Sequence, residues 1–257
     1  SRGLSMKAAV AQVCRVYYNL VVGLGLVTIA FALYRVATNG IGCQWLILAS
    51  LAILTGVFAL PLPGVKAKIS LADTIICTNL VLFGPAAGAL TAALDGIAGS
   101  LRCKTKSRRL EFLLFNTAAM TLSAALGGEA FIRVLGQTAF RYNSVASGGR
   151  FLLALGLLAL VYYLTNTLSV AAMVALDQGK NVLTVWRNGF LWAMVNYVAA
   201  SAMAGVLALI GDLITARTLV AVLTVLAPLY VSLKAYVTKA AEAERNQQSS
   251  AAAAAIK

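Results

Sequence analysis

The chain of 257 residues is 61% apolar and 11% charged, with a mean hydropathy of +0.87. Soluble domains average about 45–50% apolar and about 25% charged residues, so this composition excludes an ordinary soluble protein and indicates a polytopic membrane protein. The chain has 21 Lys and Arg, 8 Asp and Glu and no His. The lack of imidazole excludes a His-ligated haem, a His-rich zinc site, a Ser-His-Asp triad and a phospho-accepting His.

Apolar segments of membrane-crossing length recur along the chain. We expect spans at 16–34, 43–60, 70–83, 85–101, 110–126, 151–176, 188–211 and 217–238. At 1.5 Å per residue, the segment 70–83 covers about 21 Å, which is less than the roughly 30 Å hydrocarbon core. The sequence therefore predicts an all-α transmembrane bundle with about eight spans, or about six spans plus a re-entrant hairpin over 70–101.

Basic residues are distributed unequally between the two sides that these spans define. Of the 21 Lys and Arg, 16 fall on the side that holds both termini and 5 on the other side. Positive charge near span ends stays in the cytoplasm. We therefore expect a membrane protein with both termini in the cytoplasm. Topology accounts for the basicity, so no nucleic-acid partner is expected.

The largest basic group is a loop between two predicted spans. It contains Arg102, Lys104, Lys106, Arg108 and Arg109. Most such loops are topology signals, but cations at this density also attract anionic lipid, at about 1 kcal/mol per charge, or a nucleotide phosphate. These five residues are the candidate lipid or phosphate contacts, and the expected partner is a bilayer that contains anionic lipids.

Glycine and proline divide the apolar segments. Pro61-Leu62-Pro63-Gly64 should end the second span and be followed by a short extended stretch, because proline lacks the N–H that a helix needs. Gly127-Gly128 should interrupt the fifth span. The chain from residue 232 onward is charged and helix-forming. We therefore expect a transmembrane domain over 1–238 and a cytoplasmic helical connector over 239–257.

Both ends of the sequence predict a longer natural chain. The first residue is Ser1 rather than Met, and there is no cleavable signal pattern. Residues 251–255 are five consecutive alanines, which follow a segment that leads toward further structure. We give these alanines no functional weight.

Polar residues inside the predicted spans are the candidate ligand contacts, because an Asp at a helix centre costs about 2.5–3.5 kcal/mol on insertion and usually faces the protein interior. They are Asp73, Asn79, Asp95, Asn116, Asn166 and Asn196. All lie roughly 5–15 Å from the expected cytoplasmic ends. Two interpretations remain open: a ligand-contacting polar layer, or interhelical hydrogen bonds worth about 0.6 kcal/mol each.

The two carboxylates among these candidates have local interpretations as well. Asp73 is placed to cap a helix that starts near Ser70, by accepting hydrogen bonds from free N–H groups. Asp95 is placed to pair with Arg102 or Arg108, or to reach the membrane interface, and its alternative role is to coordinate a cationic group or a proton. For Asp73 we favour capping over ligand binding.

Motifs for enzymatic chemistry are missing from the sequence. It contains no carboxylate pair, no nucleophile with a base and no GxxxxGK[ST] loop. Its four cysteines, Cys14, Cys43, Cys77 and Cys103, have no CxxC spacing. We expect no catalytic site, no metal site, no disulfide framework and no cofactor.

The stretch from Ile69 to Gly96, with Phe83-Gly84-Pro85 in its middle, is followed by the basic loop and by Leu114-Phe115-Asn116-Thr117. This arrangement resembles the membrane-associated sensor (MASE-type) domains at the N-terminus of bacterial signalling proteins. In that family the sensor precedes an HD-GYP phosphodiesterase or a GGDEF cyclase domain of cyclic-di-GMP turnover. The resemblance implies a sensor in the bacterial inner membrane, present as a homodimer or with a membrane-complex partner, with a small-molecule ligand. It would pass a signal through its last helix to an output domain outside this chain.

Two other resemblances remain open. Phe83-Gly84-Pro85 with Ala86-Ala87-Gly88-Ala89 is also similar to the substrate-binding membrane subunits of energy-coupling-factor vitamin transporters. A non-catalytic accessory subunit of a larger membrane complex needs only apolar helices. A bound vitamin would favour transport, and a following catalytic domain would favour sensing.

Overall fold

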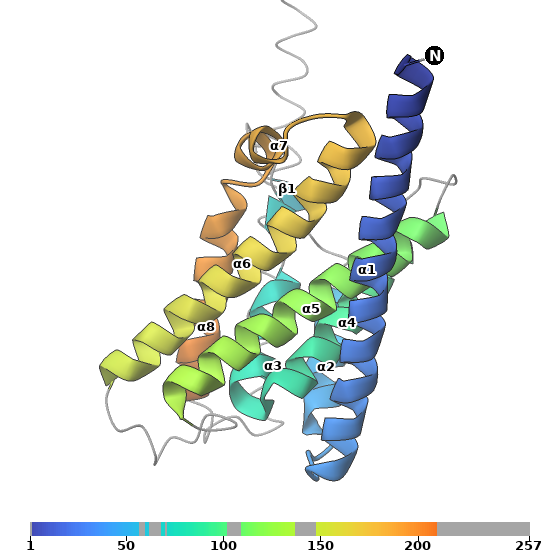
Figure 1. Ribbon diagram of the computed structural model, residues 1–257. Helices are drawn as coiled ribbons and strands as arrows, with labels where there is room; N and C mark the ends of the chain where they lie inside the picture. Colours follow the sequence, from blue (N-terminus) through green and yellow to red (C-terminus); the bar gives the residue numbers. More distant parts are fainter. Residues whose placement is uncertain are drawn as a thin grey trace, which may run out of the picture. The chain divides into compact units, whose positions relative to one another are not determined.

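The computed structural model describes residues 2–56, 60–61, 68–69, 71–101, 109–136 and 148–209 (Figure 1). These ranges hold the helices α1 (Arg2–Thr38), α2 (Gln44–Gly56), α3 (Leu71–Phe83), α4 (Pro85–Leu101), α5 (Arg109–Leu135), α6 (Gly148–Gln178), α7 (Val182–Gly189) and α8 (Ala193–Leu209), with the short strands β1 (Leu60–Pro61) and β2 (Lys68–Ile69). The expected helical bundle is confirmed for the described residues.

Three of these helices are long and apolar enough to cross a membrane: α1 over Val10–Thr38, α5 over Leu110–Leu135 and α6. The helices α7 and α8 count as a fourth crossing if they form one span, broken by a bend of 63°. The membrane class is thus supported, whereas a total of eight spans is not confirmed. The predicted span 217–238 and the connector 239–257 lie outside the described residues.

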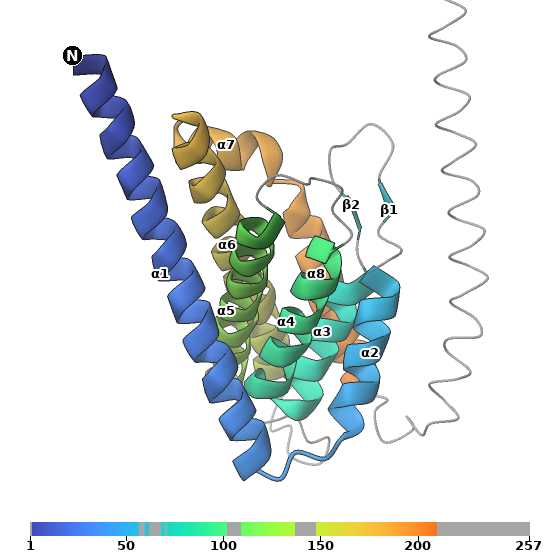
Figure 2. The same cartoon turned by 90° about the vertical axis from the view of Figure 1, so that its right-hand side faces the viewer.

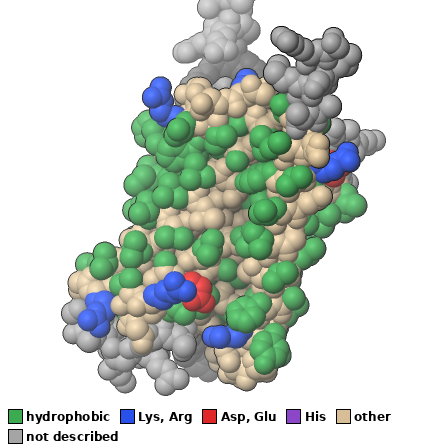
Figure 3. Space-filling model, in the orientation of Figure 1, with side chains coloured by type: hydrophobic (Ala, Val, Ile, Leu, Met, Phe, Trp, Pro, Cys, Tyr) green, Lys and Arg blue, Asp and Glu red, His purple; other side chains and the backbone are tan. Residues whose placement is uncertain are grey.

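Charged side chains lie toward the two ends of the face shown in Figure 3, and the band between them is apolar or uncharged. A bilayer requires this distribution, since charge at its centre is expensive. Figure 2 shows α1 along one side of the bundle, with its N-terminal part extending beyond the neighbouring helices. Much of α1 is exposed and apolar, including Leu20, Leu24, Val27 and Phe31.

The helices α3 and α4 form a helical hairpin joined at Gly84. This residue has φ +89°, a conformation that favours glycine, and Pro85 begins α4, where its missing N–H costs no intrahelical bond. The predicted boundary between the two segments is confirmed. Their lengths of 13 and 17 residues correspond to about 20 and 26 Å.

The predicted interruption at Gly127-Gly128 is wrong, because α5 continues through both residues to Leu135. A Cβ on Gly128 would lie 2.7 Å from Leu80 Cδ2 and 3.0 Å from Pro85 Cα, and one on Gly127 would lie 3.1 Å from Tyr162 Cβ. The glycines therefore let α5 approach α3, α4 and α6 closely. This packing offsets their low helix propensity, which costs about 1 kcal/mol each.

The predicted second span is shorter than expected. The helix α2 ends at Gly56, before Pro61. The expected extended stretch follows as a two-stranded antiparallel ladder, in which Leu60 pairs with Ile69 and Pro61 with Lys68. This ladder belongs to a different compact unit from the bundle of residues 1–59 and 70–209.

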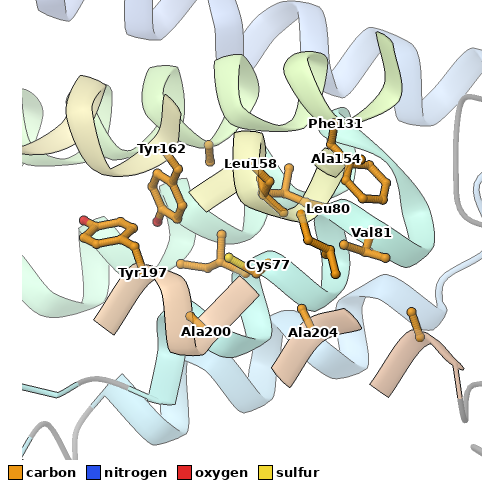
Figure 4. Packing of buried hydrophobic residues seen from close by; sticks show 14 of the residues in the cluster. Cys77, Leu80, Val81, Phe131, Ala154, Leu158, Tyr162, Tyr197, Ala200 and Ala204 are labelled. Carbon is orange, nitrogen blue, oxygen red and sulfur yellow. The ribbon is translucent and has the colours of Figure 1, made fainter. Parts of the chain in front are cut away.

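The largest buried cluster joins α3, α5, α6 and α8 (Figure 4). Its bulky members include Leu80, Phe131, Leu158 and Tyr162, while α8 contributes mainly small residues. The small residues allow α8 to lie close to α3 and α6. The candidate site lies within this group of helices.

Candidate functional site

Two of the predicted ligand residues meet in the structure. Asp73, in the first turn of α3, accepts a hydrogen bond on Oδ2 from Nδ2 of Asn196 on α8, at 2.7 Å. Its other oxygen, Oδ1, accepts a longer one from the hydroxyl of Tyr162 on α6, at 3.4 Å. The carboxylate thus connects three helices. The predicted local capping near Ser70 lies outside the described residues and stays a prediction.

A second tyrosine extends this group. The rings of Tyr162 and Tyr197 meet edge to face with centroids 4.9 Å apart, and Nδ2 of Asn166 donates to the Tyr197 hydroxyl at 2.6 Å. Figure 4 shows the two tyrosines turned toward each other beside Cys77. We call Asp73, Tyr162, Asn166, Asn196 and Tyr197 the Asp73 cluster.

The Asp73 carboxylate has no basic partner among the described residues, where its contacts are the two hydrogen bonds from Tyr162 and Asn196. Its position in the first turn of α3 supplies the favourable end of the helix dipole, worth about 0.3–1 kcal/mol. Acidic groups in membrane helices usually pair with a cation or mark a functional site. The cluster therefore has acceptor capacity that its neighbours among the described residues do not fill.

The amide of Asn166 leaves a second polar atom without a partner. Its Oδ1 is buried and accepts no hydrogen bond from the described residues. If the Asn166 amide were turned by 180°, Oδ1 would accept a hydrogen bond from the Tyr197 hydroxyl at the same 2.6 Å. The NH₂ group would then lack a partner instead. In either orientation, one polar atom of Asn166 lacks a protein partner in the part of the chain that the structure describes.

Asn79 lies in a separate polar contact. Fully buried on α3, it donates through Nδ2 to the Trp45 carbonyl at 3.2 Å and to Thr91 Oγ1 at 2.7 Å. Thr91 in turn donates to the Ala87 carbonyl at 2.8 Å. Asn79 thus links α3 to the start of α2 and to α4, as an interhelical hydrogen bond does.

Asn116 lies in a third contact. Its Nδ2 donates to Ser100 Oγ at 3.2 Å and weakly to the Gly96 carbonyl at 3.5 Å, which joins α5 to α4. The expected polar layer therefore divides. Asp73, Asn166 and Asn196 share one cluster, whereas Asn79 and Asn116 each join helices elsewhere.

Other predicted contacts are only partly covered by the structure. Asp95 is half-buried on α4. Residues 102–108, with four of the five candidate lipid contacts, lie outside the described residues, as does the side chain of Arg109, the first residue of α5. Their role stays a prediction.

Tyr162 and Tyr197 are site residues that were not among the sequence-based candidates. A buried tyrosine hydroxyl usually has a hydrogen-bond partner. Tyr162 is 0% exposed in the middle of a predicted span, and Tyr197 follows Asn196 directly. In the sequence, the place of Tyr162 in the middle of an apolar span and of Tyr197 next to Asn196 could have identified both as site residues.

The described residues have few Cys, Asp and Glu side chains. They contain no group of three His, Cys, Asp or Glu side chains that would hold a metal ion. Cys14, Cys43 and Cys77 are free thiols, and Cys103 lies outside the described part of the chain.

Comparison of the chain with protein-family models, with curated proteins and with solved structures gave no match.

Proposed function

We propose that this chain is a membrane-embedded sensor domain that binds a small polar ligand at the Asp73 cluster and transmits binding through α8. The observation that carries the proposal is the hydrogen bond between Asp73 and Asn196, since it joins the α3–α4 hairpin to α8, the last described helix. A ligand that replaced Asn196 as the donor to Asp73 would release this connection. Such a ligand shifts α8 because it binds more tightly when Asn196 is released from Asp73 than when the two side chains are joined.

The surface of α8 that faces its neighbours suits such a movement. Ala200, Ala204 and Ala208 lie buried along it, so few bulky side chains interlock with α3 and α6. Besides the Asp73 cluster, the described polar anchor is Ser201 Oγ, which donates to the Leu155 carbonyl at 2.8 Å. Few directional contacts thus hold α8 in its position.

The surrounding architecture follows the sensor resemblance. In this proposal the chain lies in a bacterial inner membrane as a homodimer, both termini are cytoplasmic, and α3 with α4 forms a re-entrant hairpin. The hairpin assignment is supported by the lengths of the two helices, since 13 residues fall short of a roughly 30 Å core. A cytoplasmic output domain outside these residues would receive the signal, and this chain has no catalysis of its own.

The test is to purify the full chain in nanodiscs and identify co-purifying small molecules by mass spectrometry. We expect a bound molecule that is lost from D73N, which removes the carboxylate that it contacts, and retained in N196A, which removes only the donor that it displaces. It should also be retained in N116A, which disturbs a half-buried Asn contact of α4 and α5 instead. Retention of the molecule by D73N, or its absence from the wild-type protein, contradicts the proposal. A co-purifying vitamin would favour the transporter resemblance.

A further inference from the structure

The short helix α7 connects α6 to α8 and has no buried residue. Asn181 precedes it as an N-cap, and its Oδ1 accepts hydrogen bonds from the backbone N–H of Leu183 at 2.9 Å and of Thr184 at 3.3 Å. The cap defines where α7 begins although its side chains contribute little to the protein core.

The residues of α7 separate into two faces. At 100° per residue, Val182, Val185 and Trp186 share one side with Leu183 at its edge. The opposite side carries the polar residues Thr184, Arg187 and Asn188. A short helix with this division is the type that lies in the plane of a membrane interface.

Two hydrogen bonds hold this segment on the C-terminal half of α6. The Trp186 indole N–H donates to Thr167 Oγ1 at 2.9 Å, and the Tyr163 hydroxyl donates to the carbonyl of Phe190, just after α7, at 3.3 Å. The axis of α7 is bent by 63° from that of α8. In Figure 1, α7 crosses one end of the bundle, between the ends of α6 and α8.

The apolar face of α7 is only partly covered by this attachment. Leu183 is 68% exposed, and Trp192, which follows in the bend, is 70% exposed. Trp is enriched at the level of the lipid headgroups, where its ring is apolar and its N–H finds water or phosphate. In a membrane protein, lipid accounts for the exposure of these two side chains at one end of the bundle.

The charges around α7 match an anionic surface. Lys180 and Arg187 are both exposed, and Arg187 lies in the last turn of α7. Between 175 and 195 the only acidic residue is Asp177, in the last turns of α6. Basic residues at this level gain about 1 kcal/mol each near an anionic leaflet, which is about fivefold in affinity.

We propose that α7, with Lys180 and Trp192, is an interfacial helix that lies in the headgroup region of a leaflet rich in anionic lipid. Its apolar face and Trp192 contact acyl chains, Lys180 and Arg187 contact lipid phosphates, and Thr184 and Asn188 face water. This surface is separate from the Asp73 cluster. It also holds if the chain is a transporter or an accessory subunit.

The placement is tested by nitroxide labels on the full chain in nanodiscs that contain phosphatidylglycerol. The labels are attached at L183C and N188C in a background of C14S, C43S and C103S, which keeps the buried Cys77. We expect the Leu183 position to be more accessible to oxygen than to a water-soluble nickel relaxant, and the Asn188 position to show the reverse. The proposal is overturned if the nickel relaxant reaches both positions equally. It is also overturned if neither position is accessible to oxygen or to the nickel relaxant.

The choice of lipid is tested by native mass spectrometry of the same chain after equilibration with mixed phosphatidylglycerol and phosphatidylcholine. We expect K180Q/R187Q to lose enrichment of the anionic lipid by about fivefold per charge removed, and D177N to gain it. The matched control R35Q/R133Q removes two charges from other helices. If K180Q/R187Q keeps its enrichment, or if the control loses as much, anionic lipid is not the partner of this surface.

Discussion

The side chains of Asn196 and Asp73 are joined at 2.7 Å although the residues lie 123 positions apart in the chain. This hydrogen bond joins the first turn of α3 to the first turn of α8. Because Tyr162 of α6 donates to the same carboxylate, three helices converge on one acidic group. Single substitutions separate the contribution of this group to stability from that of ordinary helix packing.

Removing the amide in N196A should destabilise the bundle by about 1–2 kcal/mol, because a hydrogen bond to a carboxylate is lost and an acceptor is left unfilled. The measurement is the free energy of unfolding in mixed micelles. The control is N188A, which truncates an exposed Asn on α7 and should change stability by less than about 0.5 kcal/mol. Equal losses in the two variants would show that the Asn196 contact contributes nothing specific.

The two tyrosine hydroxyls should differ in their contribution to stability. In Y197F the short 2.6 Å contact with Asn166 is lost and a second atom of that amide becomes unpartnered, so we expect a loss of about 1 kcal/mol. In Y162F the hydroxyl lost makes only a 3.4 Å contact, so the loss should be smaller. Thermal unfolding of both variants in detergent compares them directly, and a larger loss for Y162F contradicts this ranking.

Close helix packing makes G128A a destabilising change. The added Cβ would meet Leu80 and the backbone of Pro85, and overpacking of this kind costs about 1–3 kcal/mol. The matched control is G99A in α4, where a Cβ meets nothing within 4 Å and alanine should improve helix propensity. Melting temperatures in one detergent check the signs, and a stable G128A would mean that α5 lies farther from α3 than described.

The turn between α3 and α4 should reject alanine. Gly84 has φ +89°, where a Cβ is strained, so G84A should lose about 1–3 kcal/mol and loosen the hairpin. In contrast, G23A lies within α1, with open space at its Cβ, and should be neutral or stabilising. Limited proteolysis of the two variants in nanodiscs distinguishes them, because only G84A should expose new cleavage sites.

Much of the fold is predictable from hydrophobic segments, whereas the details of the site are not. The hairpin at Gly84-Pro85 follows from local backbone rules and is found within a residue of its expected bounds. Gly127-Gly128 is mispredicted because the same residues serve as turn signals in solution and as packing positions between helices. Only the surroundings of a glycine, which depend on long-range packing, decide between the two.

The candidate site shows the same limit. Asp73, Asn166 and Asn196 are identifiable as polar residues in apolar helices, but their grouping depends on which faces of α3, α6 and α8 meet. Asn79 and Asn116 share the composition and depth of this group and yet contact other helices. Periodicity alone does not specify these pairings, since the apolar residues of α6 are spread around its whole circumference.

The central claim is that the contact between Asp73 and Asn196 sets the position of α8. Double electron–electron resonance between labels at V206C on α8 and L126C on α5, both exposed positions, measures this directly in nanodiscs. We predict that N196A shifts or broadens the distance distribution relative to the wild-type protein, while N116A leaves it unchanged. Identical distributions in all three proteins would contradict the claim.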